Sequence, residues 1–471
     1  MDELLRGSAL QQADAVRSGA VSAVELAEAS LREAERVQRE LGAFTFIDGE
    51  RALAVAASIK PGDPRPFAGV PYAPKDLAHP VAGLPLTNGS VLYGDFRPGY
   101  DAVAAARIRA AGVVVIGQTR SPEMGMLPVT EPARYGAVRN PFDRKRTAGG
   151  SSGGAAAAVA GGAIAIASAS DAGGSTRVPA ACCGLVGLKP SRGRITLGPD
   201  MGDHPFAVEG CVSRDLADTA AFLDVVAGPS AGDAVFPPRP GAPFAEQLAE
   251  GPRRKVGLCV EPQFGGLVDP ERVTTARRVA EQLGEQGHDI EEITENPWPG
   301  GPIEDAFLDV FALGIGVFAA IGEMASGQQA GPNNLEPLTW AMVQRGQALS
   351  ALQLAMAQDM LHRWSVAVDT ALAAYDAVLT PTIACAPLPL GSIAAKGADI
   401  SAGMGLALRF VAFTPVANVT GRPALAMPVG FDAAGLPLSV QLIGRHADEA
   451  TLFSLGAELE RIHGLAKVVT A

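Results

Sequence analysis

One glycine- and serine-rich stretch constrains the fold of this chain more than any other segment. Residues 147–162 read TAGGSSGGAAAAVAGG, and the alternating apolar run AIAIAS follows at once. Alanine-rich sequence favours a helix, and apolar alternation favours a half-buried strand. A flexible Gly/Ser linker connects domains and does not usually run straight into core segments. The stretch therefore predicts a glycine-rich turn packed inside an α/β domain.

Two known glycine-rich motifs have sequence patterns similar to that of residues 147–162. A phosphate-binding loop ends in Gly-Lys-Ser/Thr at a helix start, and no lysine follows here. The nucleophile elbow of α/β-hydrolases is G-x-S-x-G, which GGSSG fits with Ser151 and GSSGG fits equally with Ser152. An elbow also needs an acid and a later histidine, for which His446 and His463 are available. The motif alone therefore does not decide whether these residues form a nucleophile elbow.

Composition narrows the class of protein. The 471 residues are 48% hydrophobic and 19% charged, which suits a large buried core. The net charge of -12 and the absence of any Lys/Arg run argue against a nucleic-acid partner. No signal pattern opens the chain, and no stretch of about 20 bulky apolar residues predicts a membrane span. Five irregularly spaced cysteines and six scattered histidines predict neither a disulfide framework nor a metal site. We expect a soluble cytoplasmic protein without cofactor or metal.

Helix and strand patterns alternate to about residue 227, which predicts a mixed sheet covered by helices. Ser22 and Glu25 form a capping-box pattern before a helix that extends to about residue 41. Gly112 is expected to end a helix, and a Pro/Gly-rich surface connection is expected between residues 228 and 255. The other elements expected are a buried strand at 113–119, helices over 302–375, paired strands at 423–430 and 437–444, and a helix at 448–462.

A second serine motif follows the apolar run. Ser175 comes directly after Gly173 and Gly174 in DAGGSTRVPA. Two glycines before a serine let backbone N–H groups converge on one point, as an oxyanion site needs. A serine nucleophile also needs a base, and neither motif contains a histidine. Lys75 lies in the apolar run GVPYAPKDL, and a buried lysine can act as a neutral base.

Together these motifs resemble the amidase signature family. Residues 149–180 match its signature almost end to end, residues 69–77 match its lysine motif, and the resemblance extends from about residue 5 to the C-terminus. It implies an α/β amidase signature fold, with a central mixed β-sheet covered on both faces by α-helices. It also implies one domain over residues 1–471, with a signature core at about 65–230 and a helical substrate-pocket region at about 302–375.

The resemblance also implies a Ser–cis-Ser–Lys triad. Ser175 would be the nucleophile, Ser151 the bridging serine after a cis peptide bond, and Lys75 the base. Three sets of residues would complete the site. The oxyanion N–H groups would come from Ala172, Gly173, Gly174 and Ser175. The signature loop would be supported by Gly150, Ser152, Asp171 and Arg177. The substrate pocket would be bordered by Met124, Gly125, Phe307, Phe311, Phe318 and Trp340.

The remaining question is the substrate. Segments such as TRSPEMG and FVAFTPVANVTGRPALAMPVG are most similar to the family branch that hydrolyses cyclic nylon oligomers, the aminohexanoate cyclic dimer. This implies an amide hydrolase for small, largely apolar amides, and we expect it to be a monomer or homodimer. Aryl amides, carbamates (urethanes), esters and nylon-type oligomers would be its substrates, through an acyl-enzyme. The alternative is the amidase subunit of a tRNA-dependent glutamine amidotransferase complex.

Overall fold

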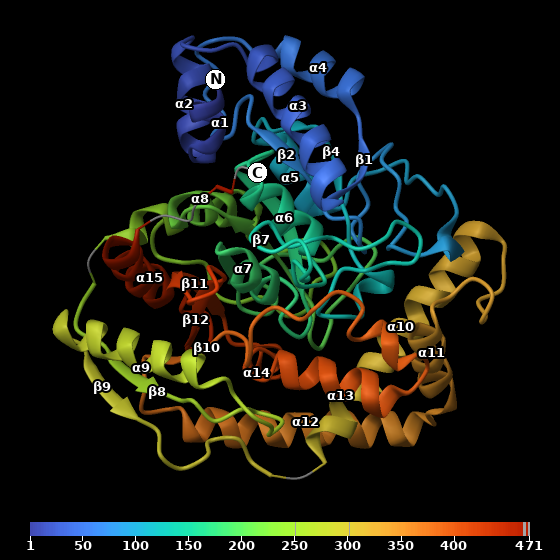
Figure 1. The fold of residues 1–471 in the computed structure, drawn as a ribbon, viewed down its shortest axis with the longest axis vertical. Coiled ribbons are helices and arrows are strands. Elements are labelled where there is room, and N and C mark those ends of the chain that lie inside the picture. The colour runs from blue at the N-terminus through green and yellow to red at the C-terminus, as the bar shows by residue number, and fades with distance from the viewer. Residues whose placement is uncertain (250, 301, 465–467, 470–471) are drawn as a thin grey trace.

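The described residues form a mixed β-sheet of ten strands through the middle of the molecule (Figure 1). The computed structural model describes residues 1–471 except 250, 301, 465–467 and 470–471. Neighbouring strands are parallel at the two ends of the sheet and antiparallel in its centre. In sheet order the strands are β3 (Val114–Val115), β2 (Pro71–Ala73), β5 (Ile166–Asp171), β7 (Val208–Ser213), β6 (Val186–Lys189), β11 (Ala424–Phe431), β12 (Pro437–Gly444), β10 (Ala377–Pro381), β8 (Lys255–Leu258) and β9 (Asp289–Glu292).

The centre of this sheet is formed by the last two strands of the chain. β11 pairs with β6 on one side, where Ala424 lies opposite Lys189. β12 pairs with β10 on the other, where Gln441 lies opposite Thr380. The five strands β3, β2, β5, β7 and β6 come from the first half of the chain, and β10, β8 and β9 come later. β11 and β12 therefore join two sets of strands that do not otherwise pair.

Helices cover both faces of the sheet (Figure 1). The pleat of β5 shows how its side chains divide between the two faces: Ala167 and Ala169 pack in one apolar cluster with α6 and α7, and Ile166 packs in another with α8 and α15. The α-helices are α1 (Asp2–Arg6), α2 (Ala9–Ser18), α3 (Ala23–Leu41), α4 (Gly49–Ser58), α5 (Val103–Ala110), α6 (Gly153–Ala160), α7 (Arg177–Cys183), α8 (Leu216–Val226), α9 (Pro270–Glu285), α10 (Ile303–Ser326), α11 (Pro337–Ala348), α12 (Ala351–Ala371), α13 (Ile400–Phe410), α14 (Pro415–Thr420) and α15 (Glu449–His463).

Most of the expected elements are confirmed. Ser22 and Glu25 make both halves of the capping box at the start of α3. Gly112, at a positive φ of 99°, lies two residues after the end of α5. The region 302–375 contains α10, α11 and α12, the two late strands are β11 and β12, and the last predicted helix is α15. Among its described residues, the predicted connection at 228–255 contains one short 3-10 helix, η3 (Phe244–Leu248), before β8 begins.

The expected strand at 113–119 is not continuous. Its first part is β3, at the edge of the large sheet. Its second part, β4 (Gly117–Thr119), pairs instead with β1 (Phe44–Ile47) in a separate two-stranded sheet. A Cβ atom at Gly117 would lie 2.3 Å from the carbonyl oxygen of Phe46. The glycine thus allows the close backbone approach through which the chain changes sheets.

The helix α10 contradicts the expectation that no segment is apolar enough to span a membrane. Among the described residues it alone is long and apolar enough, with a mean hydropathy of 1.8 over its best 18 residues. Its acidic residues Glu304, Asp305, Asp309 and Glu323 lie toward its ends and leave an apolar middle. α10 packs against α11, α12 and the short 3-10 helix η1 (Val91–Tyr93). Its buried side belongs to a third apolar cluster, beside the sheet.

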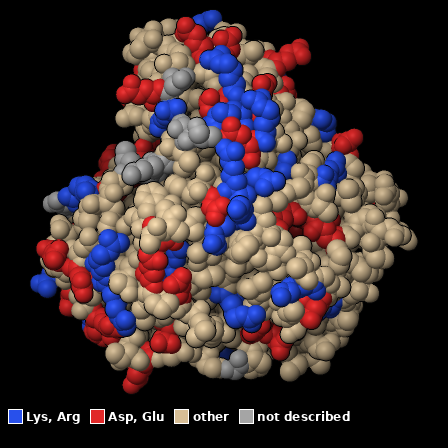
Figure 2. Space-filling model, in the orientation of Figure 1, with Lys and Arg blue, Asp and Glu red and all other residues tan. Residues whose placement is uncertain are grey.

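Surface charge is mixed, as Figure 2 shows for one face. Basic side chains form a band over the N-terminal part of the molecule, and acidic side chains border it. On α3, Arg36 lies 3.0 Å from Glu40, and Arg144 from a neighbouring loop lies 2.9 Å from the same carboxylate. Such ion pairs within the protein offset part of the positive charge that a polyanion would otherwise bind.

Candidate active site

The sheet brings the two predicted catalytic segments together. β2 and β5 are parallel neighbours, with Tyr72 opposite Ile166 and Ala73 opposite Ala167. Lys75 follows the carboxyl end of β2, and Ser175 follows the carboxyl end of β5. Because the carboxyl ends of parallel neighbouring strands meet at one edge of a sheet, the two segments meet there.

Lys75 is buried and binds two serine side chains. Its Nζ donates to Ser151 Oγ at 2.8 Å and to Ser170 Oγ at 2.9 Å. Burial lowers the pKa of Lys75 from 10.5 to about 7, against the opposing effect of the Glu209 and Asp171 charges. A substantial fraction of this amine is therefore neutral near pH 7 and able to accept a proton. The sequence patterns did not identify Ser170, which faces Lys75 because of the β2–β5 register.

Ser151 lies between the lysine and the cavity. The peptide bond between Gly150 and Ser151 is cis, as expected from the family resemblance. Ser151 is 1% exposed, and the short helix α6 begins two residues later. A Cβ atom at Gly150 would lie 2.5 Å from both the Leu127 carbonyl oxygen and the Val129 nitrogen. Only glycine fits at this position, so Gly150 sets the path of the backbone that carries Ser151.

The loop before Ser175 carries free backbone donors, with one correction to the expected set. The N–H of Gly174 donates to Asp171 Oδ1 at 2.7 Å, so it supports the loop and is not available to a substrate. Across the described residues, the N–H groups of Ala172, Gly173 and Ser175 donate to no protein acceptor. Three donors near one serine fit the requirement of an oxyanion site.

An ion pair under the loop holds its shape. Arg177 and Asp171 are both fully buried, and Arg177 donates to both carboxylate oxygens, at 2.8 and 2.9 Å. Burial alone would raise the pKa of Asp171, but the charge and hydrogen bonds of Arg177 outweigh it and hold this pKa below its usual value. Arg177 also donates to Asn418 and Gln441, which come from the last part of the chain. Ser152, the remaining expected support, donates its N–H to the Ser175 carbonyl at 3.1 Å.

Replacing Asp171 with alanine should destabilise the protein strongly. The substitution leaves the Arg177 charge buried without its partner, which typically costs about 3–5 kcal/mol. Urea denaturation followed by circular dichroism measures this loss. The matched control is Asp359→Ala, which removes the exposed ion pair with Arg363 and should change stability by less than about 1 kcal/mol. Equal effects of the two substitutions would contradict a structural role for the buried pair.

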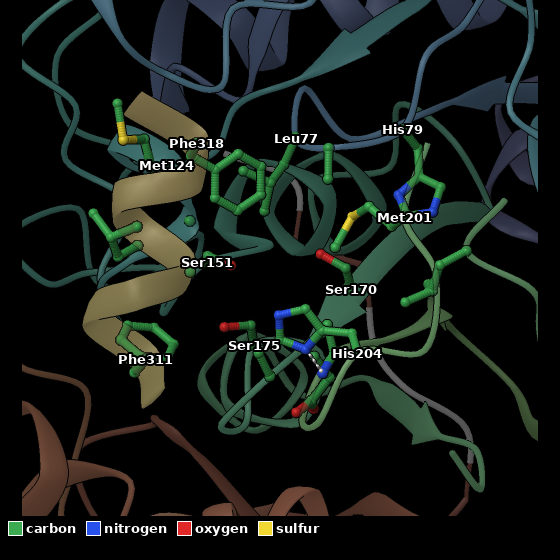
Figure 3. A pocket seen from close by; sticks show the side chains of 18 of the residues that line it. Leu77, His79, Met124, Ser151, Ser170, Ser175, Met201, His204, Phe311 and Phe318 are labelled. Atoms are coloured by element: carbon green, nitrogen blue, oxygen red, sulfur yellow. Dashed lines mark hydrogen bonds between the residues drawn. The ribbon is translucent and has the colours of Figure 1, made fainter. Parts of the chain in front are cut away.

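Two chambers meet at Ser175. The first contains Ser151 and Ser170 and is bordered on one wall by apolar side chains (Figure 3). Four of the expected pocket residues line it, namely Met124, Gly125, Phe311 and Phe318. His79 and His204 lie on the other side of this chamber from Phe311, as Figure 3 shows. Glu209 also lines the chamber, and the sequence patterns identified none of these three residues. His79 Nδ1 lies 2.9 Å from Glu209 Oε1. Burial lowers the pKa of His79, but Glu209 outweighs it and raises this pKa overall.

The second chamber is apolar. Gly173, Gly174 and Ser175 lie on one side of it, and α10 and α13 contribute the other side, including Phe307, Phe311 and Leu408. The expectation for Trp340 is wrong. This residue lies on α11 and packs, partly buried, in the third apolar cluster, and it lines neither chamber. Its helix contacts α10, which separates it from the site because α10 itself supplies the wall.

Other side chains that could act as nucleophile or base lie away from this site: two cysteines close to Ser175 in sequence, and the late histidines that a hydrolase elbow would need. Cys182 and Cys183 are completely buried, and burial raises the pKa of both thiols. His446 is half exposed and lies 3.0 Å from Asp369. Neither His446 nor His463 lines either chamber at Ser175. The elbow hypothesis therefore has no late histidine near its serine.

The fold and the site can now be compared with known protein families. The sequence profile of the amidase family matches residues 25–453. The chain therefore belongs to the amidase family, whose members are amidohydrolases acting on carbon–nitrogen bonds.

Individual relatives are similar to this chain over nearly its whole length. The 6-aminohexanoate-cyclic-dimer hydrolase of Paenarthrobacter ureafaciens is 35% identical, over 96% of this chain and 94% of the relative. A solved structure of a 6-aminohexanoate cyclic dimer hydrolase superposes with a TM-score of 0.92 at 32% identity, covering 98% of this chain and 97% of that one. A bacterial aryl acylamidase superposes with a TM-score of 0.87 at 25% identity, covering 98% and 96%. These comparisons agree with the amidase signature fold and with the resemblance to the nylon-oligomer branch.

Proposed function

We propose that this protein is a serine amidase in which Ser175 is the nucleophile, Ser151 the bridging proton carrier and Lys75 the base. The observation that carries the proposal is the 2.8 Å contact between Lys75 Nζ and Ser151 Oγ, made by a lysine whose pKa is lowered to about 7. A neutral amine at this position can accept a proton from Ser151, which in turn accepts the proton of Ser175.

Acylation then follows in balanced steps. Ser175 Oγ bonds to the amide carbonyl carbon while its proton passes to Ser151, and the proton of Ser151 passes to Lys75. The carbonyl oxygen becomes an oxyanion facing the N–H groups of Ala172, Gly173 and Ser175. Lys75 returns the proton through Ser151 to the nitrogen, the C–N bond breaks, and the amine departs. An ester between Ser175 and the acyl group remains.

Deacylation repeats these steps with water. Water attacks the ester carbonyl, and its proton passes through Ser151 to Lys75. The proton then returns to Ser175 Oγ as the C–O bond breaks, which releases the carboxylic acid. Each proton moves along the hydrogen bond that joins Ser151 to Lys75, so no metal or organic cofactor is assigned a step.

The chambers support small, largely apolar substrates. Apolar and aromatic side chains line most of both chambers, which favours alkyl and aryl groups over charged amino acids. Similarity to the cyclic-dimer hydrolases and to an aryl acylamidase supports nylon-type oligomers and aryl amides as substrate classes. Carbamates and esters present the same carbonyl geometry to Ser175, so we include them. The chain would act on these small molecules alone or as a homodimer.

A substrate panel tests this range. The isolated chain should hydrolyse p-nitroacetanilide, an aryl carbamate and a p-nitrophenyl ester, with the ester fastest because its leaving group needs the least protonation. Release of nitroaniline or nitrophenol is followed by absorbance. The alternative function, glutamine amide transfer in a tRNA-dependent complex, requires partner subunits. A chain that hydrolyses none of the three chromogenic compounds, and whose hydrolysis of glutamine is stimulated by partner subunits, would contradict the proposal and favour this alternative.

A further inference from the structure

We infer that His204 donates a hydrogen bond to a second carbonyl of the substrate, and that the preferred substrates therefore carry a second amide on the acyl side of the scissile bond. The inference rests on the proposed function and names the substrate class of the same site. His204 is a specificity-determining residue in it and takes no part in bond cleavage.

The local backbone fixes which nitrogen of His204 carries the proton. The N–H of Phe206 donates to His204 Nδ1 at 3.0 Å, and the N–H of Ala207 donates to the same atom at 2.8 Å. A nitrogen that accepts two hydrogen bonds carries no proton, so the proton of the neutral ring is on Nε2. Burial and the Arg192 charge lower the pKa of His204 to about 4, so the ring stays neutral at working pH. His204 thus presents one fixed N–H donor.

This donor is directed at the first chamber. In Figure 3 the His204 ring lies beside Ser175, on the side of the cavity opposite Phe311 and Phe318. No hydrogen bond joins Nε2 to another of the described residues. A Cβ atom at Gly314 of α10 would lie 4.0 Å from Nε2, so the glycine leaves the space in front of this nitrogen open. An N–H in a partly buried chamber needs an acceptor, and a carbonyl oxygen of the substrate can supply it.

His204 is held in a fixed position relative to the nucleophile. Asn418 Nδ2 donates to the Asp171 carbonyl at 2.9 Å and to the Phe206 carbonyl at 3.2 Å. The Phe206 ring stacks on Phe307, with centroids 4.9 Å apart. One side chain therefore ties the loop before Ser175 to the loop that carries His204. A constant separation between nucleophile and donor is what recognition of two carbonyls in one molecule requires.

The two chambers differ in polarity, and this difference indicates which chamber binds the acyl part of the substrate and which binds the amine part. The second chamber is built from apolar residues and glycines and suits an aryl amine. The first chamber combines an apolar wall, which suits a methylene chain, with the polar wall that carries His204. An acyl chain that ends in an amide satisfies both walls. An alkyl chain without an amide leaves the Nε2–H without a partner when it displaces water.

Binding to a protein without its nucleophile tests the inference directly. In the Ser175→Ala background, calorimetry compares two p-nitroanilides, one of 6-acetamidohexanoic acid and one of the unbranched fatty acid of equal length. We expect the acetamido compound to lose affinity by about 5- to 100-fold in the added His204→Asp variant, as is typical when a buried hydrogen bond loses its partner. The fatty anilide should change much less.

The matched variant is His204→Asn. Both asparagine and aspartate can accept the two backbone N–H groups at this turn, but only asparagine also offers an N–H donor. Asparagine should therefore retain most of the preference for the acetamido compound, and aspartate should lose it. The inference would be overturned if His204→Asp lowered the affinity for both ligands equally, or if the Ser175→Ala protein showed no preference for the acetamido compound. Either result would leave the serine mechanism intact. Turnover of either anilide by the Ser175→Ala protein would instead contradict the proposed function.

Discussion

Replacing Ser175 with alanine should lower the rate of anilide hydrolysis by about 10⁴-fold or more, because the acyl-enzyme can no longer form. Initial rates with p-nitroacetanilide measure the loss, and circular dichroism confirms that the fold is kept. The Ser175 carbonyl still accepts from the Ser152 N–H in this variant, since only the side chain is removed.

Two controls separate this mechanism from the hydrolase elbow. Ser152→Ala removes the other candidate serine. Its Oγ donates to the Ser170 carbonyl and accepts from the Ser170 N–H, both over a long 3.4 Å, so this substitution should cost less than about tenfold. His446→Ala removes a half-exposed histidine paired with Asp369 and should leave the rate unchanged. Activity that survives in Ser175→Ala but disappears in Ser152→Ala or His446→Ala would contradict the assignment.

Replacing Lys75 with methionine should lower the rate by about 10³-fold, since general-base catalysis contributes roughly 10²–10⁴-fold. The ionisation of Lys75 should also be visible in the pH dependence of kcat/KM of the wild-type enzyme. Only neutral Lys75 accepts a proton, and its pKa is lowered to about 7. The value of kcat/KM should therefore be constant well above pH 7 and fall about tenfold for each pH unit below it.

The arginine variant distinguishes a base from a positive charge. Lys75→Arg keeps the charge but cannot lose its proton at any working pH, so it should be as inactive as Lys75→Met. Stability provides a second readout. A lysine with a pKa near 7 in the folded state and 10.5 when unfolded binds fewer protons folded, so the wild-type protein should gain stability as pH rises from 7 to 10.5. Lys75→Met should lose this gain. A flat activity profile between pH 5 and 9 would contradict the base role.

The sequence predicted the local chemistry well, because each motif is a continuous segment. The glycines before Ser175, the glycine before Ser151 and the apolar run before Lys75 all describe short-range geometry, and the structure brings the three segments together. Asp171 and Arg177 lie six residues apart, so their pairing also belongs to one motif.

The parts that the sequence could not predict depend on contacts between distant segments. Ser170 faces Lys75 only because β2 and β5 pair in one register, and His204 enters the site from a loop with no pattern of its own. Trp340 was misplaced because a helical pattern shows that a residue is apolar but not which neighbour covers it. The strand at 113–119 was misjudged because a run of apolar residues does not show which strand each part pairs with, and the pairing partner changes at Gly117.

The central position of β11 and β12 has a consequence for how the protein is made. On the ribosome these strands emerge after all the others, so until then β6 and β10 each keep an open edge that invites pairing with other chains. Asn418 and Gln441, which hold Arg177, also arrive only at that stage. A chain cut off before residue 410 would thus lack both the join between its two sets of strands and the support of its catalytic loop. Such a fragment should be inactive and prone to aggregate, and adding the missing segment as a separate peptide should restore solubility before activity.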